Sequence, residues 1–298
     1  MSSAVLPNAP AAREVPADEA FADLERRGRW LRNPSVVIGG GIVALVVLSA
    51  IVSIFWTPYD PLAVNPAHAL AAPSWAHWLG TDEYGRDEFS RLMASSQIAL
   101  FVGALSVLIA TAIGIPAGLL AAAREGAISQ VVLRVTDILY GFPALLAAVV
   151  LAAAFGASKM TVVLAIGIAY IPVFIRVTRS NALVVLNSEY VLAARAYGRR
   201  TFSILRRHVV PNIATTIIAQ MSLLFSLAIL AEAALDFLGL GTVAPTASWG
   251  TMLASSQDYL GSDALLTLWP SLAIVACVLG FSLLGDGISE LREARRRS

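Results

Sequence analysis

The sequence is poor in charge and almost free of cysteine. Among its 298 residues, 14% are Asp, Glu, Lys or Arg and 57% are hydrophobic, whereas soluble domains carry about 25% charged residues. The one cysteine, Cys277, lies in an apolar run. It cannot form a disulfide within the chain, and its surroundings indicate a packing role. This composition predicts an all-α integral membrane protein without a disulfide framework.

Motifs for nucleotide binding and catalysis are also missing. The only lysine, Lys159, stands in the run A-S-K-M, so the chain has no G-x-x-x-x-G-K-[ST] phosphate loop. No serine occupies a G-x-S-x-G elbow. The three histidines, His68, His77 and His208, are scattered and indicate no metal site. The sequence therefore predicts no catalytic, metal or cofactor site of the chain's own.

Six apolar runs free of charged residues predict six transmembrane helices. A helix needs about 20 residues to cross the hydrocarbon core of a bilayer. The predicted spans are 36–56, 98–123, 138–158, 160–175, 213–231 and 264–285. The fourth is short, so we expect Lys159 and Arg176 at its ends to extend toward the headgroups.

The basic residues set the orientation of these spans. If the N-terminus is cytoplasmic, 18 of the 21 Lys and Arg residues fall in cytoplasmic segments. Such a bias is the positive-inside pattern, and it predicts a multi-pass protein of the cytoplasmic membrane with both termini in the cytoplasm. The division is a cytoplasmic tail over 1–34, a six-helix domain over 35–290 and a basic cytoplasmic tail over 291–298. Within the first tail, 19–32 is either a basic helix on the membrane surface or a flank that only fixes orientation.

Two longer segments, 57–97 and 237–263, are then predicted to face outward. The first contains the sequence LGTDEYGRDEFSRL, in which we expect Thr81 to cap a helix with Asp82 and Glu83 in its first turn. Either segment could contact an extracytoplasmic partner or cover the spans.

The stretch 188–211 is a charged, amphipathic segment between two spans on the cytoplasmic side. It predicts a helix ended by Gly198, then a second helix that is capped by Thr201 and stops at Pro211. One face of the first helix has spacing i, i+3, i+4 and i+7 and consists of Tyr190, Ala193, Ala194 and Tyr197. Its alanine centre and the neighbouring Arg195 and Arg199 suit insertion into a groove of a soluble partner. The alternative is an interfacial helix whose arginines contact lipid phosphates.

The fifth span carries several polar residues. Thr215, Ser222 and Ser226 share one helical face, and Gln220 lies near them. This face could line a polar path through the membrane. Alternatively, its small hydroxyl side chains simply let helices approach closely.

Several motifs resemble one family. The run E-Y-V-x-A-A-R-A-x-G followed by R-H-x-x-P-N resembles the cytoplasmic coupling loop of ABC importer permeases, E-A-A-x3-G with a proline thirteen residues later, which is Pro211 here. The runs at 79–87 (LGTDEYGRD), 134–143 (RVTDILYGFP), 230–250 (LAEAALDFLGLG…P…SWG) and 283–287 (LLGDG) resemble the C-type permease subunit of dipeptide, oligopeptide and nickel importers.

This resemblance implies a type I ABC importer permease that forms half of a translocation pathway. The partners it implies are a second permease chain, two ATPase subunits that hold ATP and Mg, an extracytoplasmic substrate-binding protein and the lipid bilayer, with no nucleic acid. The cargo it implies is a di- or oligopeptide, with nickel chelates, glutathione and opines as alternatives. The competing class is a self-contained channel or facilitator.

The resemblance also implies which residues couple the chain to the ATPase. They lie in helix 188–200 of loop 180–212 and around it, and they are Glu189, Tyr190, Ala193, Ala194, Arg195, Gly198, Arg199 and Pro211. The family's leading glutamate is replaced by Leu192. We therefore expect the Ala193–Ala194 face and the arginines to make the contact, with Glu189 as the nearest acid.

Overall fold

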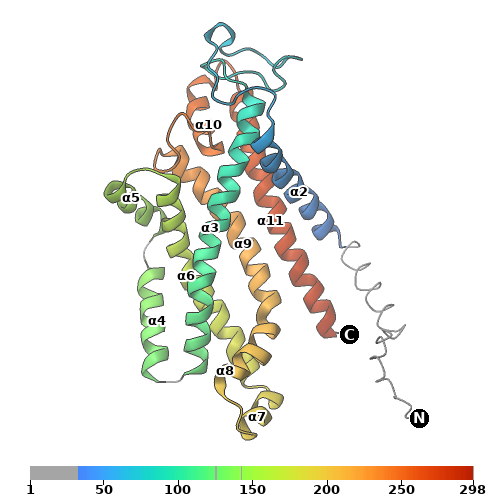
Figure 1. Cartoon of the computed structure of the whole chain (residues 1–298), viewed down its shortest axis with the longest axis vertical. Coiled ribbons are helices and arrows are strands. Elements are labelled where there is room, and N and C mark those ends of the chain that lie inside the picture. The colour runs from blue at the N-terminus through green and yellow to red at the C-terminus, as the bar shows by residue number, and fades with distance from the viewer. Residues whose placement is uncertain (1–32, 125, 142, 298) are drawn as a thin grey trace, which may run out of the picture.

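The computed structural model describes residues 33–124, 126–141 and 143–297, which form an elongated bundle of long helices (Figure 1). Within these residues there are no strands, only one isolated bridge between Thr81 and Asp87, so the predicted all-α class is confirmed. The helices are α2 (Pro34–Phe55), α3 (Glu88–Ala123), α4 (Ala127–Tyr140), α5 (Ala144–Phe155), α6 (Lys159–Leu186), α7 (Glu189–Ala196), α8 (Thr201–Ile204), α9 (Val210–Phe237), α10 (Trp249–Ser256) and α11 (Leu265–Arg297).

Five helices are long and apolar enough to cross a membrane. They are Pro34–Phe55, Glu88–Ala123, Lys159–Leu186, Thr201–Phe237 and Leu265–Glu290, and each corresponds to one predicted span, with two boundaries differing by one residue. Most are longer than the apolar run that predicted them, since that run marks only the part inside hydrocarbon. The 36 residues of α3, for example, measure about 54 Å.

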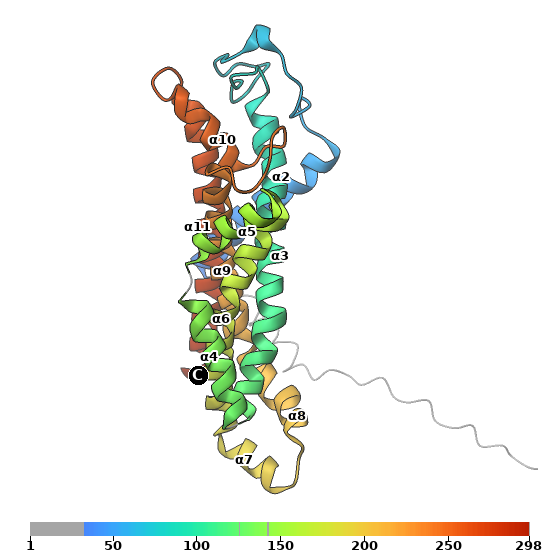
Figure 2. The same ribbon diagram turned by 90° about the vertical axis from the view of Figure 1, so that its left-hand side faces the viewer.

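The third predicted span, 138–158, is wrong as a single helix. The helix α4 begins earlier, at Ala127, and ends at Tyr140. A second helix, α5, begins at Ala144, with Pro143 in an extended conformation as its N-cap. Because α3 and α6 run in the same direction, α4 and α5 together return the chain to the outward end (Figures 1 and 2). The sixth crossing therefore exists, but two short helices make it.

The two ends of the bundle differ in content. One end carries α7 and α8, and the opposite end carries the loops 56–87 and α10 (Figure 2). Asn33 donates a hydrogen bond of 2.8 Å to Glu290 in α11, so the first and last described helices begin and end on the same side. The possible surface helix at 19–32 lies outside the described residues, and the tail after 290 continues α11 to Arg297.

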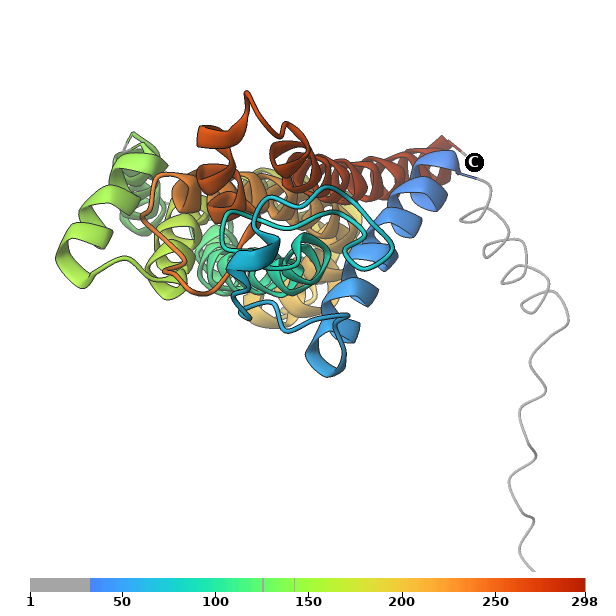
Figure 3. The ribbon, with the colours of Figure 1, turned by 90° about the horizontal axis from the view of Figure 1, so that it is seen from above.

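The most extensive helix packing joins α3 and α6. Glycines allow it: a Cβ added at Gly114 would lie 2.6 Å from the Cβ of Phe174, and one at Gly118 would lie 2.8 Å from the Cβ of Thr178. Small residues four positions apart let membrane helices approach in this way. Seen from above, α2 and α5 lie at opposite edges of the bundle (Figure 3).

Candidate functional site

The helix α7 forms the turn at one end of the bundle, and its end is defined by backbone geometry. Gly198 has φ +75°. Its amide donates to the carbonyl of Arg195 at 2.9 Å, and the amide of Arg199 donates to the carbonyl of Ala194 at 3.2 Å. This pair of bonds is a Schellman motif, which glycine favours because it has no Cβ. The predicted role of Gly198 as the end of the helix is therefore confirmed.

One side chain anchors α7 to the rest of the protein. Val191 is fully buried, at 0% exposure, in the same apolar cluster as Leu186, Ile204 and Val209. No other residue of α7 is buried. The helix is therefore fixed at one point and leaves most of its surface accessible.

The face predicted to dock is exposed. Tyr197 is 90% exposed and Tyr190 is half-exposed, while Ala193 is exposed and Ala194 is half-buried. The other predicted coupling residues are half-buried or exposed as well: Glu189, Arg195, Gly198, Arg199 and Pro211. Leu192, which stands at the place of the family's glutamate, is 49% exposed. The structure thus places the predicted residues between Glu189 and Arg199 on one accessible turn, whereas Pro211 lies apart from them at the start of α9.

The second helix of this region does not stop at Pro211, so that prediction is wrong. Thr201 is its first helical residue and not its N-cap as predicted, because Arg200 holds that position. The helix runs from Thr201 without interruption into α9, which ends at Phe237. A π-helical turn over Leu205–Val209 joins the two parts. The amide of Val210 donates to the carbonyl of Leu205, five residues back, and Pro211, which has no N–H to donate, follows directly after this π-helical turn.

Polar contacts tie α7 to the start of α9. The side-chain amide of Asn212 donates to the hydroxyl of Tyr190 at 3.4 Å and to the carbonyl of His208 at 2.7 Å. The rings of Tyr190 and His208 lie 6.0 Å apart. Because α9 is one continuous helix from this point to Phe237, α7 is in direct contact with the start of a helix long enough to span a membrane.

The residues proposed to line a path occupy different environments. Thr215 and Gln220 are half-buried. The hydroxyl of Ser222 donates to the carbonyl of Phe281 in α11 at 2.7 Å, and the hydroxyl of Ser226 donates to the carbonyl of Ser222 at 3.2 Å. In this structure, both serines use their hydroxyl groups for helix contacts. Their role in a path stays a prediction.

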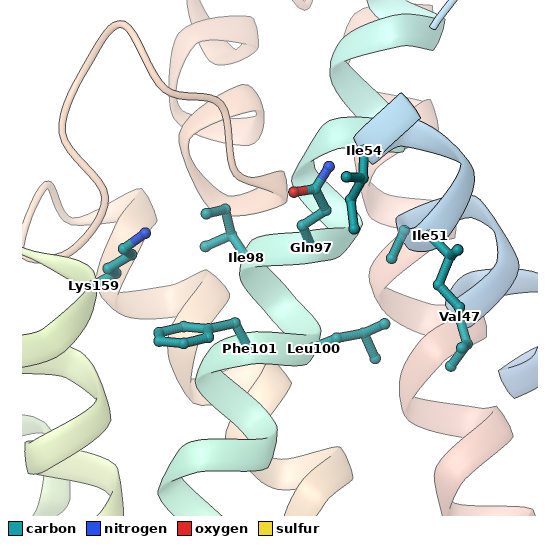
Figure 4. A pocket seen from close by; sticks show the side chains of 9 residues that line it. Val47, Ile51, Ile54, Gln97, Ile98, Leu100, Phe101 and Lys159 are labelled. Atoms are coloured by element: carbon teal, nitrogen blue, oxygen red, sulfur yellow. The ribbon is translucent and has the colours of Figure 1, made fainter. Parts of the chain in front are cut away.

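A groove of about 320 Å³ runs along α3 between α2 and the start of α6 (Figure 4). Its walls are almost entirely aliphatic, and its polar groups are Gln97, whose amide donates to the hydroxyl of Ser53 at 2.8 Å, and Lys159, whose ammonium lies 5.4 Å from the ring of Phe101. Apart from Lys159, the lining residues carry no ionisable group, and none of them has a hydroxyl or a thiol. Within the described residues, no group of three or more His, Cys, Asp or Glu could hold a metal ion.

The outward motif LGTDEYGRD folds around a buried carboxylate, a role that sequence reasoning missed. Asp82 accepts from the amides of Tyr84 and Arg86, both at 2.9 Å, and from the Nε of Arg86 at 2.6 Å. The Nε of Arg91 lies 3.4 Å from the same carboxylate. Thr81 does not cap a helix, because α3 begins at Glu88 with Asp87 as its N-cap.

Next to this cluster, burial raises the pKa of the Glu83 carboxyl group.

Comparison with known families agrees with this architecture. The family described as "Binding-protein-dependent transport system inner membrane component" matches residues 114–298, and "N-terminal TM domain of oligopeptide transport permease C" matches residues 26–73. The fold resembles that of a chain of the MetNI methionine ABC transporter, with a TM-score of 0.56 and 18% sequence identity over 68% of this chain and 95% of that one.

Relatives match nearly the whole chain. The dipeptide transport system permease protein DppC of Alkalihalophilus pseudofirmus is 35% identical and covers 95% of this chain and 91% of its own length. The glutathione transport system permease protein GsiD of Pectobacterium atrosepticum is 36% identical, covering 91% and 90%. The di/tripeptide transport system permease protein DppC of Pseudomonas aeruginosa is 38% identical, covering 90% and 91%. The chain therefore belongs to the family of binding-protein-dependent transport system inner membrane components, as a multi-pass permease subunit of an ABC importer.

Proposed function

We propose that this permease imports short peptides by coupling α7 to ATPase subunits in the cytoplasm. The observation that supports this proposal is the exposed turn of α7, which is anchored by Val191 alone and linked through Tyr190 and Asn212 to α9. An accessible helix joined to a membrane span is suited to convert a partner's movement into movement of that span.

The partners follow from what the chain does and does not contain. Its sequence has no phosphate loop, so ATP and Mg bind to two ATPase subunits. A second permease chain completes the translocation pathway, and an extracytoplasmic binding protein delivers the cargo. Closure of the ATPase subunits on ATP draws the coupling helices together. The pathway then switches from inward to outward facing by rigid-body movement.

The proposed cargo class is the di- or oligopeptide. The names of two relatives refer to dipeptides or tripeptides and a third refers to glutathione, itself a small peptide. This assignment can be tested with the reconstituted complex, by measuring uptake of labelled di- and tripeptides in the presence of unlabelled nickel chelates. Selective inhibition by the chelates would overturn it.

Gly198 offers a matched pair of variants for testing the coupling. Its positive φ makes any side chain cost about 1–2 kcal/mol, and no atom of the chain lies within 4 Å of an added Cβ. Gly198→Ala and Gly198→Trp therefore have the same backbone strain, but only Trp projects bulk from the docking surface.

We expect Gly198→Ala to keep most peptide uptake in the reconstituted complex. Gly198→Trp should keep membrane insertion and assembly of the permease pair but lose most uptake per ATP hydrolysed. Equal uptake by the two variants would contradict the coupling role. Peptide flux through the purified chain without ATP or partners would instead favour a self-contained facilitator.

A further inference from the structure

Two acidic side chains are buried at the outward end of α9. Glu232 and Asp236 are each 1% exposed and stand four residues apart, so they project from the same face of the helix. Burying an ionised carboxylate without a partner is costly. Two such groups on one helical face therefore require a specific stabilising arrangement.

Asp236 attaches the segment 238–248 to the helix. One of its carboxylate oxygens, Oδ1, accepts the amide of Thr242 at 2.8 Å. The contact is so close that a Cβ added at Gly241 would lie 1.8 Å from this oxygen, and one at Gly250 would lie 2.7 Å from the Cβ of Asp236. The two glycines thus permit the chain to fold tightly over the carboxyl group.

The remaining oxygens of the pair lack donors. Within the described residues, neither side-chain oxygen of Glu232 has a hydrogen-bond partner, and neither does Oδ2 of Asp236. The two side chains stand one helical turn apart on the same face of α9, which is the spacing at which side chains of a helix can contact each other. Cys277 of α11 is a further titratable side chain beside this part of α9, since it is fully buried in the apolar cluster that also contains Ala233. Two carboxylates are both acceptors and repel, whereas a carboxyl group and a carboxylate form a strong hydrogen bond.

We propose that Glu232 and Asp236 share a single proton, and that this proton holds the segment 238–248 closed against α9. Glu232 carries the proton and donates it to Oδ2 of Asp236, and Asp236 in turn accepts the amide of Thr242 through Oδ1. Removal of the proton brings two negative charges into contact and displaces Asp236 from its place under Gly241. The outward cover of α9 is therefore protonation-dependent.

The dependence on pH has a defined slope. In an opened segment the two carboxyl groups are hydrated and ionise as ordinary carboxylic acids, whereas the closed segment retains one proton. Between about pH 5 and the pH at which the closed pair itself ionises, each opening event releases one proton. The opening constant should then rise about tenfold for each pH unit, and the slope should flatten above that range.

Hydrogen–deuterium exchange of the segment 238–248 in the purified full complex measures this opening constant. We expect the wild type to show the tenfold slope, and Glu232→Gln to show no slope because its amide donates to Asp236 at every pH. Asp258→Asn, at an exposed acid of the same outward region, serves as the control and should keep the wild-type slope. A wild-type slope in Glu232→Gln would overturn the proposal. So would protection that depends on sodium or potassium concentration and not on pH, because a bound cation would then replace the proton.

Infrared spectroscopy of the wild-type complex keeps the proposal testable even if Glu232→Gln fails to assemble. At neutral pH, the wild type should show the C=O stretch of a protonated carboxylic acid, shifted in heavy water and retained in Asp258→Asn. Asp236→Asn is a second variant in which that band should weaken or move. A wild-type spectrum without a protonated carboxyl band at neutral pH would refute proton sharing.

Discussion

Val191 is the side chain whose removal best isolates the anchoring of α7. It is fully buried among Leu186, Ile204 and Val209, so Val191→Ala deletes two methyl groups from a packed site. Each buried carbon contributes about 0.8 kcal/mol, and the cavity left behind adds to the cost. We therefore expect the packing of α7 against the bundle to be weakened by about 2 kcal/mol. Because α7 has no second buried residue, this loss should favour local detachment rather than unfolding of the bundle.

A loss of about 2 kcal/mol raises the population of detached α7 about 30-fold. Hydrogen–deuterium exchange of residues 189–204 in the purified complex should show this increase, and uptake per ATP hydrolysed should fall. Leu192→Ala is the matched control, because Leu192 is on the same helix but 49% exposed, and it should change exchange little. Equal protection in the two variants would refute the single-point anchor.

Four other substitutions test packing and charge through thermal unfolding of the purified complex. Gly114→Ala should lower the free energy of unfolding by about 1–2 kcal/mol, because its Cβ would overlap Phe174. Gly41→Ala has open space around its Cβ and should raise that free energy by up to about 1 kcal/mol. Effects of equal sign in the two variants would contradict this reasoning. Asp82→Ala removes the carboxylate from beside two arginines and should lower the free energy of unfolding by about 3–5 kcal/mol. An unchanged unfolding temperature would contradict this prediction. Asp137→Asn breaks the 2.7 Å ion pair with Arg176, whose two side chains are 64% and 48% exposed. The free energy of unfolding should therefore fall by less than about 1 kcal/mol. A larger decrease would show that this pair is shielded from water in the complex.

The apolar runs of the sequence predict the positions of the long helices but not their continuity. The run 138–158 has no charge to mark an interruption, yet the structure divides it at Gly141 and Pro143. Proline by itself does not identify such a break, because Pro116 and Pro172 lie inside continuous helices. In a membrane bundle, neighbouring helices can satisfy the backbone groups that a proline leaves free. The outcome is therefore decided by tertiary contacts that a single sequence does not contain.

The same reason explains the wrong end point at Pro211. The sequence shows a helix-breaking residue before a membrane span, and a stop is the local expectation. The structure instead places a π-helical turn over Leu205–Val209 and lets the side chain of Asn212 bond to the carbonyl of His208. Gly198 was predictable because its function depends on its own backbone angle. The consequence of Pro211 depends on a turn formed by five preceding residues.

The ion pairs of Asp82 were the least visible feature of the candidate site. Thr81 and Asp87 both suit the N-cap of a helix, and local chemistry does not choose between them. The choice follows from Asp82, which the structure buries against Arg86 and Arg91 instead of placing it in a first helical turn. Arg91 lies nine residues further along the chain, beyond the range of any local capping pattern.

Side chains hold the two ends of the helix bundle to different degrees, and this difference bears on how the permease moves. At the outward end, charged and aromatic groups are buried with specific partners: Asp82 binds Arg86, and the indole of Trp249 donates to the carbonyl of Leu92 at 3.1 Å. At the opposite end, α7 has one buried side chain, Val191. A lever needs a free end and a fixed end, and local opening requires least free energy where few apolar groups are buried. Force applied by a cytoplasmic partner would therefore displace α7 and the start of α9 first, while the outward end of α9 stays attached through Asp236 until its own contact with Thr242 is released.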